Sequence, residues 1–149
     1  MNPLDGPKAP VRFLDFVIGG RPLYRYLRSH EYFDLVGCIW LEPEWGRRWS
    51  ANHLLELMLK RRSELPGGQV ILYLCPECQE VDCGAITVRI EADDKVFRWT
   101  GWAYVDWDGQ REEDVGPLRI VEFERSRYEQ VLSDTLRLFQ EPRPPDPSL

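Results

Sequence analysis

Residues 70–74, VILYL, and residues 86–90, ITVRI, stand on either side of a short cysteine-rich connection, CPECQEVDC at 75–83. The first run is continuously apolar and of strand length, and in the second run apolar residues alternate with polar ones, as in a half-buried strand. Strands joined by so short a connection pair antiparallel. The stretch therefore predicts a β-hairpin with the cysteines at its tip, and the rest of the fold is built around it.

Further strand-like segments lie on both sides of this hairpin. Residues 11–18 are rich in β-branched and aromatic side chains and end at the turn signal Gly19–Gly20, and residues 32–40 form another short strand pattern. Three later segments extend the antiparallel meander: 95–100, 102–107 and 118–123.

Two segments have the pattern of longer helices. In the first, Ser50 is the predicted N-cap of a helix with an apolar face, which ends before Pro66. In the second, apolar residues recur at helical spacing over 125–139. Pro22 suits the first turn of a short helix at 23–27, with a second hairpin strand as the alternative. The sequence predicts an α+β fold, in which an antiparallel sheet of hairpins is packed by two main helices.

The 149 residues are enough for one domain with one core. Residues 1–10 and 141–149 are rich in proline and predict a flexible N-terminal segment and a flexible tail, which leaves 11–140 as a single α+β domain. The chain has 6 Trp, 6 Tyr and 6 Phe, so we expect a core packed by aromatic rings.

The formal net charge of -6 disfavours a nucleic-acid partner, because binding to phosphates needs a basic face. A basic protein partner fits this sign, although mild acidity is also a common means of solubility. No apolar run approaches the length that spans a bilayer, and the first ten residues lack the features of a signal peptide. The expectation is a cytoplasmic protein with no membrane partner.

Cys75, Cys78 and Cys83 are the predicted metal ligands, because thiolates gathered at a hairpin tip can share a zinc ion. Structural zinc needs four ligands, and Cys38 is the preferred fourth. Its alternatives are His30, His53, Asp82 and water. Cysteines in a reducing compartment are more often metal ligands or free thiols than disulfides, so thiols that simply pack the loop are the competing interpretation.

A redox role for the Cys75 and Cys78 dithiol is the alternative function. Dithiols of the thioredoxin type lie at a helix N-terminus, which lowers the pKa of the first thiol. Here the residues after Cys83 have a strand pattern, and the carboxylates of Glu77 and Glu80 oppose thiolate formation. The sequence therefore favours a structural metal site over a thiol-dependent oxidoreductase.

Five carboxylates gather in the segment 106–114, whose spacing and surrounding strands do not match a calcium-binding EF-hand. A solvated acidic loop is the simplest interpretation, and contact with a basic partner such as a toxin is the functional one. The candidate partner-binding residues are Asp106, Asp108, Glu112, Glu113 and Asp114.

No catalytic motif is present around His30 or His53, and the sequence contains no nucleophile elbow, phosphate-binding glycine loop or dinucleotide fingerprint. These absences lower the expectation of an enzyme without excluding one, because many active sites have no linear signature.

Residues 65–78, LPGGQVILYLCPEC, and 82–88, DCGAITV, resemble a segment of small uncharacterised bacterial proteins that carry a strand, a CPEC turn, a CGA return and a tryptophan-containing strand. The resemblance implies a bacterial protein and no particular activity. In size and acidity the chain is similar in general character to immunity proteins that neutralise toxins. The sequence thus predicts a non-enzymatic protein-binding domain with a zinc-holding cysteine hairpin.

Overall fold

The computed structural model describes most of the chain between residues 11 and 140. The described residues are 11–28, 35–42, 45–63, 65–75, 84–106, 109–112 and 119–140.

The largest sheet has six strands, and all strand pairs among the described residues are antiparallel. Its order is β10-β8-β7-β6-β4, and β9 also pairs with β8. The strands are β4 (Val36–Gly37), β6 (Gln69–Leu74), β7 (Ala85–Ala92), β8 (Val96–Asp106), β9 (Gly109–Glu112) and β10 (Val121–Glu124). Because β6, β7 and β8 follow one another in the chain and in space, the predicted hairpin forms the centre of the sheet.

The N-terminal part forms two small ribbons. Their strands are β1 (Arg12–Leu14) with β5 (Ile39–Glu42), and β2 (Val17–Ile18) with β3 (Arg21–Pro22). Gly19 and Gly20 join β2 to β3 and both have positive φ, +60° and +79°, which a two-residue hairpin turn requires. The single strand predicted over 11–18 is interrupted at Asp15 and Phe16, which belong to neither β1 nor β2.

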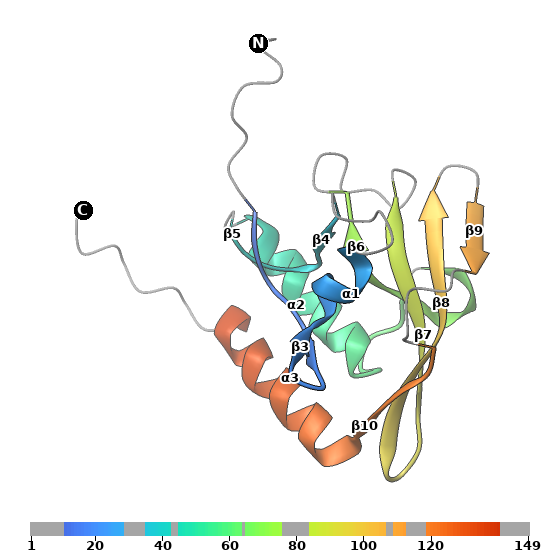
Figure 1. Ribbon diagram of the computed structural model, residues 1–149. Coiled ribbons are helices and arrows are strands. Elements are labelled where there is room, and N and C mark those ends of the chain that lie inside the picture. Colours follow the sequence, from blue (N-terminus) through green and yellow to red (C-terminus); the bar gives the residue numbers. More distant parts are fainter. Residues whose placement is uncertain are drawn as a thin grey trace, which may run out of the picture.

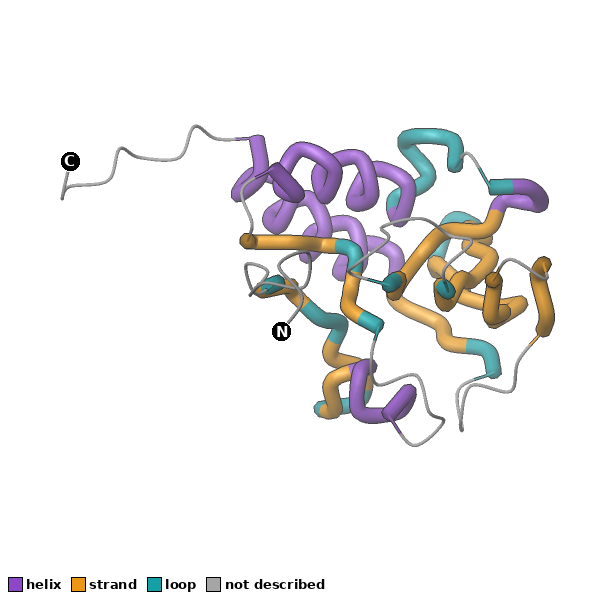
Figure 2. Tube along the Cα trace, turned by 90° about the horizontal axis from the view of Figure 1, so that it is seen from above, coloured by secondary structure: helices purple, strands orange, loops and turns teal. Residues whose placement is uncertain are grey.

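Helix α1 (Leu23–Arg28) follows β3 at the predicted position. The two longer helices are α2 (Trp45–Leu57) and α3 (Arg125–Gln140). Figure 1 shows both longer helices on one side of the six-stranded sheet, and the view from above in Figure 2 shows the same grouping. A short 3-10 turn, η2 (Pro66–Gly68), leads into β6.

Helix α2 begins at Trp45, before the residue predicted to cap it. Ser50 lies inside the helix, fully buried, where its hydroxyl donates to the Gly46 carbonyl at 2.8 Å and accepts from the Trp40 backbone N–H at 2.6 Å. Gly46 is required here, because a Cβ atom at this position would lie 2.7 Å from the Trp40 ring. The sequence pattern does not indicate this first turn, because the turn is stabilised by its contact with β5 and not by local helix signals.

Strand β8 joins the two segments predicted at 95–100 and 102–107. Gly101 lies at an irregularity in the register between β7 and β8 and has a φ of +58°, so the strand bends at this point without ending. The last predicted strand is also shorter than expected, since β10 covers only Val121–Glu124.

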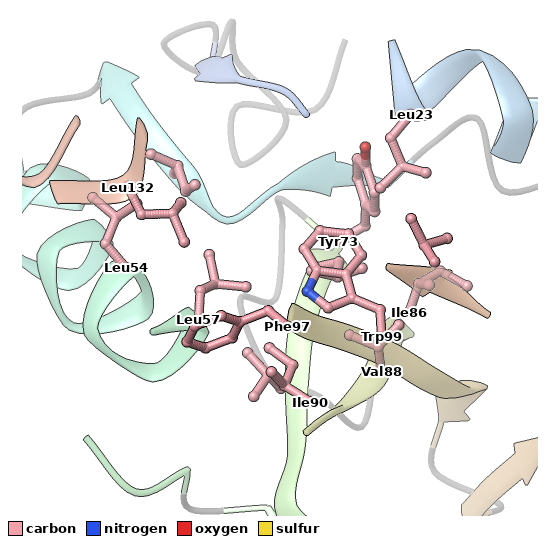
Figure 3. Close-up of a cluster of buried hydrophobic side chains, with 14 of the residues drawn as sticks. Leu23, Leu54, Leu57, Tyr73, Ile86, Val88, Ile90, Phe97, Trp99 and Leu132 are labelled. Carbon is pink, nitrogen blue, oxygen red and sulfur yellow. The ribbon is translucent and has the colours of Figure 1, made fainter. Parts of the chain in front are cut away.

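The main core lies between the central sheet and the two longer helices. Figure 3 shows Leu54, Leu57 and Leu132 from the helices facing the sheet residues Phe97 and Trp99. The expected aromatic packing is present, since Phe97 stacks on Tyr128 with ring centroids 4.4 Å apart, and the Trp99 ring meets Phe16 and Phe123 edge-on. The α+β class with an antiparallel sheet is confirmed.

Candidate functional site

The cysteine connection begins and ends at the tip of a well-defined hairpin. Leu74 pairs with Ala85, and beyond this pair the Cys75 backbone N–H donates to the Gly84 carbonyl at 3.1 Å. Gly84 has a φ of +127°, and a Cβ atom there would lie 2.9 Å from the Tyr104 hydroxyl. The two ends of the connection are therefore held side by side at a position that only glycine fits without strain.

Cys75 is half-buried and packs against the main core. Cys78 and Cys83, the other two predicted ligands in this connection, lie outside the described residues, as does Asp82. Of these three cysteines, the structure therefore positions Cys75. It also positions Gly84, the residue that follows the connection.

Cys38 lies between β4 and β5 and is buried in a second, smaller apolar cluster with Leu74 and Ala85. Burial raises the pKa of the Cys38 thiol well above its ordinary value, and the negative charge of Glu56 adds to this effect. The thiol form is favoured there, so Cys38 would need a metal ion nearby to become a thiolate.

Cys38 and Cys75 pack in different clusters because β6 contains an irregularity. Ile71 pairs with Thr87 and Tyr73 pairs with Ile86, so Leu72 is an extra residue on β6 relative to β7. Leu72 and Tyr73 both belong to the main core, whereas Ile71 packs against the smaller cluster. The extra residue changes which face of the sheet the following side chains occupy.

The remaining alternatives for the fourth ligand are the two histidines. His53 is buried on α2, where its ring meets Trp49 edge-on and its Nδ1 lies 3.3 Å from the Trp49 carbonyl oxygen. Burial lowers the pKa of His53, with a smaller contribution in the same direction from the positive charge of Arg61. His30 lies outside the described residues. Within the described ranges, no three His, Cys, Asp or Glu side chains gather as a metal site.

The acidic segment 106–114 is in part a β-hairpin and not a continuous loop. Asp106 ends β8 and pairs with Gly109, and Glu112 ends β9, where it pairs with Ala103. Asp108, Glu113 and Asp114 lie outside the described residues, and only the backbone of Asp106 and Glu112 is described. Strand β9 stands at the edge of the main sheet, since its described pairing is with β8 alone.

A cavity that the sequence did not predict lies between residues 14–18, α3 and the sheet. Its volume is about 420 Å³. Most of its lining is apolar, and the lining residues include Phe16, Ile18, Leu54, Trp99, Phe123 and Val131. The sequence carries no local signal for this cavity, because its lining residues come from segments that are far apart in the chain.

Asp15, at the break between β1 and β2, shapes one wall of this cavity. Its carboxylate accepts hydrogen bonds from the backbone N–H groups of Phe16 and Tyr24, each at 2.9 Å, and from the Tyr73 hydroxyl. Burial raises the pKa of Tyr73, and the adjacent Asp15 raises it further, so Tyr73 stays a hydrogen-bond donor. The carboxylate therefore ties α1 and the N-terminal ribbons to the centre of the sheet.

Compared with known proteins, the chain matches no family model, no curated protein and no solved structure. Among the helices in the described part of the chain, none has both the length and the apolar character needed to cross a bilayer.

Proposed function

We propose that this chain is a non-enzymatic protein-binding domain whose cysteine hairpin is stabilised by a zinc ion. The observation that carries the proposal is the closure at the start of the cysteine connection, where the Cys75 N–H donates to the Gly84 carbonyl. Cys83 directly precedes Gly84 in the chain, so thiols are attached on both sides of this closure. A third thiol, Cys78, belongs to the same connection.

The donor set suits zinc in a structural role. Three thiolates and one further ligand form the tetrahedral shell typical of structural zinc sites, and zinc binding would offset the entropy lost by ordering the nine-residue connection 75–83. Cys38 is the proposed fourth ligand, and its packing against Leu74 and Ala85, the last strand pair before the cysteine connection, supports it. Cys38 is buried in a different apolar cluster from Cys75. Its role as a zinc ligand therefore needs a test of its own.

The metal proposal is tested by elemental analysis of the natively purified protein, with one zinc ion per chain expected. Cys78→Ser should abolish zinc binding and lower the free energy of unfolding. Cys38→Ser separates the alternatives for the fourth ligand, because zinc is lost if Cys38 is a ligand and retained if water or another residue takes this place.

A thiol titration distinguishes this proposal from thiol-dependent redox chemistry. Bound zinc should leave the thiols of the hairpin unreactive until a chelator is added. A single reactive thiolate in protein free of metal, together with a reversible disulfide between Cys75 and Cys78, would contradict the structural role.

The partner that we propose is a basic protein, and a bacterial toxin neutralised in the cytoplasm is the kind of partner that fits best. The net charge of -6 and the carboxylates of the segment 106–114 support this choice, because opposite charge accelerates association and discriminates between partners. The position of β9 at the sheet edge supports it further, since a hairpin at an edge is accessible to another protein.

Affinity purification from the source cells tests the partner. The wild-type chain should retain a basic protein, and a variant that combines Glu112→Gln, Glu113→Gln and Asp114→Asn should retain much less of it. A matched variant, Glu122→Gln, Glu129→Gln and Asp94→Asn, removes three carboxylates elsewhere on the protein and should keep the partner. Equal loss with both variants would show that overall charge, and not this segment, determines binding.

A further inference from the structure

The apolar cavity between residues 14–18 and α3 has the dimensions of a ligand site. Its volume of about 420 Å³ lies within the range of roughly 300–1,000 Å³ that small-molecule sites occupy. Most of its lining residues come from residues 14–18, from α3 and from the sheet, and Figure 1 shows the β2–β3 ribbon beside α3. Val17 and Val131 line the cavity and are 67% and 54% exposed, so apolar surface faces solvent at its entrance.

The polar groups in the interior of the cavity are already hydrogen-bonded to the protein. The Trp99 indole N–H donates to the Tyr128 hydroxyl at 3.2 Å, and this hydroxyl donates to the Leu57 carbonyl at 2.7 Å. Asp15 accepts its three hydrogen bonds from the protein as well. A ligand in the interior of the cavity would therefore gain affinity from apolar contacts and would find no polar group there, among the described residues, that lacks a hydrogen bond. This environment favours a ligand with an apolar body.

The rim has a different character, because one of its polar side chains has no hydrogen-bond or ion-pair partner among the described residues. Glu124 accepts a hydrogen bond from the Ser126 hydroxyl at 2.6 Å, and the Thr135 hydroxyl donates to the Val131 carbonyl at 2.7 Å. Arg127 lines the cavity and is exposed, and its guanidinium makes no hydrogen bond or ion pair with any described residue. A guanidinium only donates hydrogen bonds, and it matches the geometry of a carboxylate.

We propose that this cavity binds a small apolar carboxylate, with its hydrocarbon body among Phe16, Trp99 and Leu132 and its carboxylate at Arg127. The apolar body supplies most of the affinity, since it displaces water from the cavity. The contact with Arg127 is exposed to solvent, so it contributes less to affinity than to the choice of headgroup. This site is independent of the cysteine hairpin and of the proposed protein partner.

Isothermal titration calorimetry tests the proposal with decanoate and decylammonium, each below the concentration at which it forms micelles, and with decanol below its solubility limit. We expect saturable binding of one decanoate per chain, about threefold tighter than that of decylammonium, because the headgroup charge is reversed next to Arg127 while the Glu124 carboxylate at the same rim opposes part of this effect. Arg127→Gln should weaken decanoate binding about threefold, in line with an exposed ion pair, and leave decanol binding unchanged. Arg137→Gln is the matched control, since it removes the same charge from α3 outside the cavity lining.

The location is tested by filling the entrance. Val131→Trp should weaken the binding of decanoate and of decanol at least tenfold, because the indole occupies the apolar space that the ligand needs. Leu138→Trp is the control, since Leu138 lies on the same helix, is exposed to the same 54% and does not line the cavity. Thermal unfolding of each variant shows that it is folded.

Three results would overturn the proposal. Absence of binding by all three ligands would show that the cavity is not a ligand site. Equal affinity for decanoate and decylammonium, in wild type and in Arg127→Gln, would refute the carboxylate assignment. Equal weakening by Val131→Trp and Leu138→Trp would place the ligand elsewhere on the protein.

Discussion

His53 is an example of how burial changes a single residue. The sequence predicts His53 as an alternative metal ligand. In the structure His53 is buried on α2, and its ring meets that of Trp49 edge-on. An imidazole in this environment is favoured in its neutral form, which accounts for the lowered pKa of His53. The neutral ring still has one N–H, and the Trp49 carbonyl oxygen, 3.3 Å from Nδ1, is positioned to accept it.

This burial predicts that the protein loses stability in mild acid. In the unfolded chain His53 takes up a proton near its ordinary pKa of 6.5, whereas the folded protein takes it up only at lower pH. The free energy of unfolding should therefore fall as the pH drops below 6.5, by at most about 1.4 kcal/mol per pH unit from this residue.

Urea unfolding at pH 7.5 and pH 5.5 measures this effect. His53→Gln should reduce the difference between the two pH values, because glutamine does not titrate. An unchanged difference in the variant would assign the pH dependence to other groups.

At the scale of elements, the end of α2 contains a residue in an unfavourable backbone conformation. Leu59 has a φ of +60°, the left-handed region in which residues with a Cβ atom are strained. The Lys60 N–H donates to the Leu55 carbonyl at 2.9 Å and the Leu59 N–H to the Glu56 carbonyl at 3.0 Å, which together form a Schellman motif. Glycine is the residue that this position in the motif favours.

Leu59→Gly should therefore stabilise the protein by about 0.5–1 kcal/mol, since relief of strain outweighs the greater freedom of glycine in the unfolded chain. The loss of apolar contact is small, because the Leu59 side chain is 48% exposed. Leu59→Ala keeps the strained Cβ atom and should give no gain. Thermal unfolding of the two variants beside wild type makes the comparison, and equal stability of both would disprove a strained helix end.

At the scale of the whole molecule, one carboxylate joins the N-terminal ribbons to the sheet. Asp15 contacts Tyr73, on β6, and Tyr24, on α1, so the position of residues 12–28 over the core depends on it. The ring of Phe13 meets both tyrosine rings near the same junction. The cavity proposed as a ligand site has its N-terminal wall in this part of the chain.

A double-mutant cycle with Asp15→Ala and Tyr73→Phe measures this connection. We expect an interaction free energy of about 1.5–3 kcal/mol, as for a hydrogen bond to a charged group that is partly shielded from water. Hydrogen exchange in residues 12–28 should accelerate in Asp15→Ala more than in the centre of the sheet. Additive effects of the two substitutions would mean that the ribbons are held by apolar packing alone.

Local patterns were sufficient to predict several elements of this fold. The hairpin of β6 and β7, the short helix α1, the turn at Gly19–Gly20 and the helix α3 all have their signal within a few consecutive residues. The signals are apolar residues at strand or helical spacing, a turn dipeptide and a proline at the start of a helix, and each favours one backbone conformation locally. The aromatic content also predicted correctly that rings would pack the core.

The candidate sites were harder to predict, since they depend on contacts between distant segments. The separation of Cys38 from Cys75 follows from the extra residue on β6, and the early start of α2 follows from the contact of Gly46 with Trp40. The cavity exists because Asp15 interrupts a strand and α3 lies across the gap. The sequence by itself predicted the central hairpin and α3 and placed three cysteines in one connection, because these are properties of residues close together in the chain. Only the tertiary structure decided that Cys38 and Cys75 pack in different clusters and that an apolar cavity stays open beside α3, because both depend on how separate elements pack.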